Sequence, residues 1–244
     1  MDHLEVATLA PVEDYVPGER RFSLWEAARA CRQFRHCVQA NAPRPERLAV
    51  LCLAMQVTPQ GRGSVWEHCE QTAHCAQELV HALGLPEAER QDWQQRLGVD
   101  WLPPDLFEPQ AASRLQAVDA SRLLSYLAWH DCGKPFVWQL DEQGRSHYPQ
   151  HAEVSADIWL QACGSPEEAE LMRLDMLLHT CSAQELEGFA KHPLLDTLVL
   201  ASWAALWANA QDFGGTSSSS FLAKRKQLLR RTRAAFRQGT AYTA

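Results

Sequence analysis

The chain has 244 residues, of which 46% are hydrophobic, and this suits one large domain or one domain with additions. No run approaches the ~18 apolar residues of a membrane span, and the acidic N-terminus lacks a signal-peptide pattern, so we expect a soluble, cytoplasmic protein without membrane contact. The net charge of −7 argues against a general nucleic-acid binder.

Helical periodicity dominates the first third of the chain and predicts an all-α fold. One helix is expected from Ser23 and a second from Pro45, both within an N-terminal extension, 1–60, that packs on the core. The clearest helix follows: Ser64 and Glu67 have the spacing of a capping box, and Gly84 ends the apolar stripe.

The segment 85–118 loses this periodicity and contains two adjacent prolines, so we expect an irregular insertion there. Helical pattern resumes at Asp119 and reaches His130 or Asp131. Residues 136–149 alternate around Gly144 and predict a hairpin-like excursion.

Three more helices are expected at 151–163, 166–181 and 193–212. A serine-rich loop at 214–220 then leads into a basic C-terminal helix, so we divide the chain into 1–60, a core domain 61–213, and 214–244. Residues 224–237 hold seven basic and no acidic residues. This segment is either an RNA contact or a solvated helix face.

The cysteines are spread through the predicted helices, and no CxxC pair occurs among them. A zinc ribbon and a disulfide scaffold are therefore not indicated, and buried free thiols are expected. The eight positions are 31, 37, 52, 69, 75, 132, 163 and 181.

Several ionisable residues fall on apolar helix faces. Asp131 follows Leu124 and Leu127 at i+7 and i+4, and a buried carboxylate requires a cationic partner or a metal. His68 borders the apolar face of its helix, His179 follows two methionines at helical spacing, and Asp212 ends an apolar stripe. One buried histidine is usually a core residue, but several beside the adjacent His130 and Asp131 favour a metal site.

The order His68, His130-Asp131, Asp212 resembles the HD superfamily of metal-dependent phosphohydrolases. The segments "SVWEHCEQT", "LAWHDCGKPFVWQLDEQGRSHYPQHAEVSADI" and "RLDMLLHT" are similar to the HD domain fused to bacterial tRNA nucleotidyltransferases, over residues 64–212. The chain departs from that family in the length of the segment between His68 and His130. It also has Asn209 after Ala208 where the family has an Ala-Asp pair, which leaves Asp212 or Asn209 as the last ligand, and we favour Asp212.

The resemblance implies an HD-type helical bundle in which His68, His130, Asp131 and Asp212 hold a divalent ion: manganese, iron, cobalt, nickel or magnesium. A second ion would add His151 and His179, with Asp131 bridging; alternatively His151 contacts substrate. Lys134 would act beside Asp131 in catalysis and contact a phosphate oxygen, and Arg145 is a weaker candidate for a substrate contact.

The expected activity is attack of a metal-activated water on the phosphorus of a nucleotide or an RNA-terminal phosphate. The alternatives are a single-strand nuclease of the HD type and a degenerate HD fold that binds a nucleotide or a protein without turnover.

Overall fold

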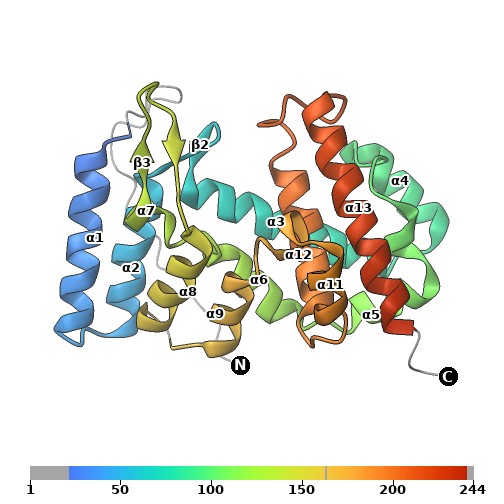
Figure 1. Ribbon diagram of the computed structural model, residues 1–244, viewed down its shortest axis with the longest axis horizontal. Helices are drawn as coiled ribbons and strands as arrows, with labels where there is room; N and C mark the ends of the chain where they lie inside the picture. Colours follow the sequence, from blue (N-terminus) through green and yellow to red (C-terminus); the bar gives the residue numbers. More distant parts are fainter. Residues whose placement is uncertain (1–21, 163, 241–244) are drawn as a thin grey trace.

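The structure is a computed structural model that describes residues 22–162 and 164–240. Within these two ranges, helix accounts for 69% of the residues and strand for 4%, so the predicted all-α class is confirmed. In Figure 1 the N-terminal helices lie at one end of the long axis, and α4 (Glu87–Leu97) and α13 (Ser219–Thr240) lie toward the other.

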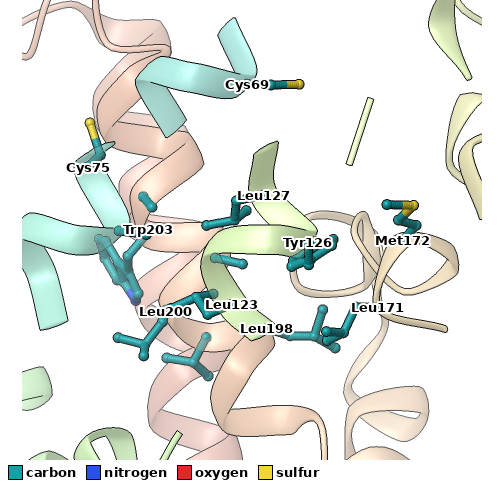
Figure 2. Packing of buried hydrophobic residues seen from close by; sticks show 14 of the residues in the cluster. Cys69, Cys75, Leu123, Tyr126, Leu127, Leu171, Met172, Leu198, Leu200 and Trp203 are labelled. Carbon is teal, nitrogen blue, oxygen red and sulfur yellow. The ribbon is translucent and has the colours of Figure 1, made fainter. Parts of the chain in front are cut away.

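Three helices form the centre of the bundle. α3 (Val65–Leu83) packs against both α6 (Ala120–Trp129) and α12 (Leu195–Ala208). The predicted capping box at Ser64 and Glu67 begins α3, and α12 is apolar almost all round because neighbours cover it on every side. Figure 2 shows Tyr126 and Leu127 of α6 among buried side chains of α3, α9 (Pro166–Arg173) and α12.

The described part of the predicted N-terminal extension, residues 22–60, packs on this core, and residues 1–21 lie outside the described residues. α1 (Leu24–Gln39) lies against α2 (Arg44–Gln56) and against the short α7 (Lys134–Val137). α2 also contacts α3 and α8 (His151–Ala162). Helix α1 buries Phe34 and presents arginines on its outer face, so its amphipathic pattern accounts for this placement.

The prediction of irregular structure in the segment 85–118 was wrong. This segment forms α4 (Glu87–Leu97), a 3₁₀ helix η1 (Pro104–Phe107) and α5 (Pro109–Gln116). The prolines stand at helix starts, where the missing N–H costs nothing. In α4 only Trp93 is buried, and its indole N–H donates to Glu78, so the helix has little apolar periodicity to reveal it.

Two small antiparallel hairpins project from the bundle. The predicted excursion contains β3 (Gln139–Leu140) and β4 (Ser146–His147), with Gln139 opposite His147. Sequence reasoning missed the other, β1 (Pro59–Gln60) with β2 (Gly63–Ser64), because it is only six residues long from end to end.

The C-terminal half is more divided than expected. The predicted helix 166–181 is broken into α9 (Pro166–Arg173) and α10 (Leu177–Thr180), followed by α11 (Ala183–Phe189). The helix predicted to reach residue 212 ends at Ala208, with Asn209 as its C-cap. α13 (Ser219–Thr240) begins inside the serine run and is anchored by buried Arg231, which donates to the carbonyls of α10.

The seven cysteines among the described residues are free and buried, as predicted; Cys163 lies outside those residues. Across residues 22–162 and 164–240, no helix is both long and apolar enough to cross a bilayer.

Candidate metal centre

Five side chains from four segments meet where α6 ends. His68 lies in the first turn of α3, His130 is the C-cap of α6, and Asp131 follows it. Lys134 begins α7 and His151 begins α8. His130, Asp131 and Lys134 are buried, so the predicted inward direction of the His–Asp pair is confirmed.

Gly133 explains how the turn after α6 can lie so close to α8. Its N–H donates to the Ser155 hydroxyl at 2.9 Å, and a Cβ at this position would overlap the backbone of Val154 and Ser155. Only glycine permits this approach. The contact fixes the turn that carries Asp131 against the helix that carries His151.

Three imidazoles surround the Asp131 carboxylate. The Nε2 atoms of His68 and His130 lie 3.5 and 3.4 Å from Oδ2, and Nε2 of His151 lies 3.6 Å from Oδ1. These separations exceed those of ordinary hydrogen bonds. They match the ligand–ligand edge of about 3.4 Å around a tetrahedral ion with bonds of about 2.1 Å. His68, His130 and Asp131 together could hold a metal ion, and this donor set therefore fits one.

In His130 and His151, the ring nitrogen that points away from Asp131 makes a hydrogen bond to a backbone carbonyl. This bond selects the tautomer that a metal ligand needs. Nδ1 of His130 lies 2.7 Å from the Leu127 carbonyl, and Nδ1 of His151 lies 3.1 Å from the Tyr148 carbonyl. A carbonyl oxygen only accepts, so each Nδ1 is protonated and donates. In the neutral form of each ring, Nε2, which faces Asp131, is then the nitrogen with the lone pair; on His130 a metal ion would have to displace the proton that the Asp131 charge stabilises by raising the pKa of that ring.

The cluster is electrostatically coupled. Burial alone would raise the pKa of Asp131, but the Lys134 ammonium and the neighbouring imidazoles hold it far below its usual range. Burial lowers the pKa of His68 to about 3. Burial also acts to lower the pKa of His130, but the Asp131 charge overcomes it and holds that pKa well above its ordinary value.

Lys134 is a buried member of the cluster. Its Nζ lies 2.6 Å from Asp131 Oδ2 and 3.0 Å from Gln60 Oε1, and it sits 5.3 Å from the centre of the Tyr148 ring. The ammonium therefore already supplies a positive charge to Asp131, which an isolated buried carboxylate would lack.

Three predicted ligands, His151, His179 and Asp212, lie outside the group that could hold an ion, and of these His151 faces Asp131. Burial lowers the pKa of His179, the nearby charges of Lys224 and Arg231 act in the same direction, and its backbone carbonyl accepts from Arg231. The carboxylate of Asp212 lies against Gly61 in the turn of the first hairpin. Asn209 and Asp212 were predicted to lie on one face of a helix that reaches residue 212. Because α12 ends at Ala208, they do not continue its face.

Arg145 is an exposed residue of the second hairpin. Its Nε donates to Asp141 at 2.7 Å, and His147 also contacts that carboxylate. Asp141 is thereby doubly bound, and the hydrogen bond from His147 is the largest cause that lowers its pKa. The structure thus places Arg145 in a local surface network.

Sequence reasoning missed the role of the β1–β2 hairpin. Gln60 accepts from Lys134, the Pro59 carbonyl accepts from the Tyr148 hydroxyl, and Gly61 lies beneath Asp212. The pair of glycines in "QGRGS" was the available signal of a tight turn. Nothing in that pattern indicates which distant side chains the turn touches.

Comparisons with protein-family models, with curated proteins and with solved structures find no match to this chain. The chemistry of the cluster therefore stands on its geometry: it combines a charged carboxylate, three imidazoles and a lysine ammonium.

Proposed function

We propose that the chain is a metal-dependent phosphohydrolase of the HD type that acts on nucleotides or RNA-terminal phosphates. The observation that carries this proposal is the convergence of the His68, His130 and His151 Nε2 atoms on the carboxylate of Asp131. The resemblance of the segments around these residues to HD domains supports the same assignment.

Each residue has a definable task in such a reaction. His68, His130 and Asp131 would hold the ion, with His151 beside them, and this imidazole-rich set suits iron, cobalt or nickel better than magnesium. A divalent ion there would lower the pKa of a coordinated water and neutralise phosphoryl charge. Lys134 holds a positive charge next to Asp131 and can neutralise a phosphate oxygen.

A specific observation favours a second function, a degenerate HD fold that binds a nucleotide or a protein without turnover. Asp131 Oδ2 already has the Lys134 ammonium at 2.6 Å, and the Asp212 carboxylate lies on Gly61. A cluster neutralised by lysine needs no ion. The two functions differ in whether the purified protein binds a divalent metal.

Metal analysis of the purified protein, followed by a hydrolysis screen, tests the proposal. The screen uses bis-p-nitrophenyl phosphate, p-nitrophenyl phosphate, 2′,3′-cyclic nucleotides and single-stranded RNA, each with manganese, iron, cobalt, nickel and magnesium. We expect bound metal and diester or monoester hydrolysis. Cleavage within the RNA would instead favour a nuclease.

Variants connect any activity to the cluster. Asp131→Asn should lose both metal and activity, the latter at least about 100-fold because it weakens the site and its charge at once. His74→Gln, an exposed histidine on the same helix as His68, is the matched control and should behave as wild type. A folded wild type that binds no divalent ion and hydrolyses nothing would rule out the hydrolase and leave the binding function.

A further inference from the structure

A groove of about 400 Å³ separates α1 from α7, apart from the metal-binding group. Its walls include Arg32 and Arg35 from α1, and Phe136 and Trp138 from α7 and the residue that caps it. The volume lies in the range of small-molecule sites, roughly 300–1,000 Å³. The resemblance to HD domains does not extend to α1, so it does not account for this groove.

One wall of the groove is cationic. Arg32 and Arg35 are exposed and lie one helical turn apart on α1, so their guanidinium groups can face one ligand. Among the described residues, the groove is lined by no acidic side chain, and neither arginine has an ion-pair partner within 4.0 Å. On a protein of net charge −7, this wall is a local patch of positive charge that favours an anion.

The opposite wall is aromatic and fixed in place. The Phe136 ring packs edge-on against Phe34, with ring centres 5.6 Å apart. The indole N–H of Trp138 donates to the Ser146 hydroxyl of β4 at 3.0 Å. Both rings are half-buried, so each keeps an accessible surface, and a ligand would not have to order them.

A cation–π contact joins the cationic wall of the groove to the aromatic wall. The guanidinium carbon of Arg35 lies 5.7 Å from the centre of the Phe136 ring, so positive charge and an aromatic surface lie next to each other in the groove. An aromatic base stacks on such rings, and guanidinium groups bind phosphate in a bidentate way. A simple anion would not use the rings, and an apolar peptide would not use the arginines.

We propose that the α1–α7 groove binds a nucleobase together with its adjacent phosphate, from either a free nucleotide or a single-stranded RNA. Helix α7 presents Lys134 to the metal-binding group and Phe136 to the groove. The inference deepens the proposed function by naming a site for its class of substrate, but binding at the groove requires no metal.

The test measures binding in EDTA, so that failure of hydrolysis and failure of this site remain distinguishable. The probe is a fluorescein-labelled single-stranded RNA of about ten nucleotides, followed by fluorescence anisotropy at two salt concentrations. We expect saturable binding that weakens with salt. Competition by unlabelled AMP would identify a free nucleotide as sufficient, and its failure would identify the RNA strand as the ligand.

Charge reversal and ring removal locate the site. Arg32→Glu with Arg35→Glu, and separately Trp138→Ala, should each weaken binding about ten-fold or more. The arginines are exposed, so the double variant should fold normally even if Trp138→Ala does not. Arg44→Glu, an exposed arginine at the start of α2, is the matched control and should bind as wild type.

The basic helix α13 is the competing surface for RNA, and it lies toward the other end of the molecule (Figure 1). Lys226→Glu with Arg230→Glu should leave AMP competition and groove-dependent binding intact. Absence of binding by wild type, or loss of binding only in the α13 variant, would overturn the proposal.

Discussion

The ammonium of Lys134 lies 2.6 Å from the carboxylate of Asp131, and both side chains are buried. Three imidazoles also face this carboxylate, but they are too far from it for ordinary hydrogen bonds. The buried charge of Asp131 is thus balanced by lysine in the structure, and a divalent ion would add to that balance.

Lys134→Met should leave the buried Asp131 charge without its nearest partner. In EDTA we expect the free energy of unfolding to fall by about 3–5 kcal/mol, the usual cost of breaking a buried ion pair. Manganese should add more stability to the variant than to wild type, because in the variant the ion replaces the lysine charge that offset the Asp131 carboxylate. Urea unfolding with and without manganese measures both effects.

Lys226→Met, at an exposed lysine of α13, is the control and should change stability by less than about 0.5 kcal/mol. If manganese does not reduce the stability loss of Lys134→Met, metal binding at Asp131 is contradicted.

The buried, neutral His68 should make stability depend on pH. Burial lowers its pKa to about 3, whereas the unfolded chain takes up this proton near pH 6.5. Its contribution is therefore complete above pH 6.5 and is lost as the pH falls toward 3. The slope can reach about 1.4 kcal/mol per pH unit.

Urea unfolding in EDTA between pH 6.5 and 5 tests this, since carboxylates dominate only at lower pH. His68→Gln should lose less stability than wild type over that interval. Equal slopes for the two proteins would show that His68 is not held neutral.

Gly133→Ala should disrupt the turn that carries Asp131. The added methyl group would overlap the backbone of Val154 and Ser155, so α8 must move, and we expect a loss of at least about 2 kcal/mol. Thermal unfolding measures it. Gly188→Ala is the matched control: this glycine lies in α11 with open space around it, and alanine there should be neutral or stabilising.

Asp212→Asn should lower affinity for a divalent ion far less than Asp131→Asn does. Asp131 is within the group that could hold an ion, whereas the Asp212 carboxylate lies against Gly61. Titration calorimetry with manganese compares the two variants. Equal losses would restore Asp212 as the last ligand and require the β1–β2 turn to move on metal binding.

The helices around the cluster were predictable because their signals are local. The capping box at Ser64 and Glu67 and the apolar spacing before Asp131 depend only on neighbours along the chain. For the same reason α4 was missed, since a polar helix with one buried tryptophan has little periodicity. The HD-type identity and the activity remain predictions.

The spacing of apolar residues was enough to predict that His130 and Asp131 are buried and that His68 borders an apolar helix face, because a residue's helix face follows from its spacing. Only the tertiary structure decided that Lys134 pairs with Asp131, that Asp212 lies on Gly61, and that α1 forms a groove with α7. Those contacts join segments that spacing cannot relate, since they depend on how helices and hairpins far apart in the chain pack together.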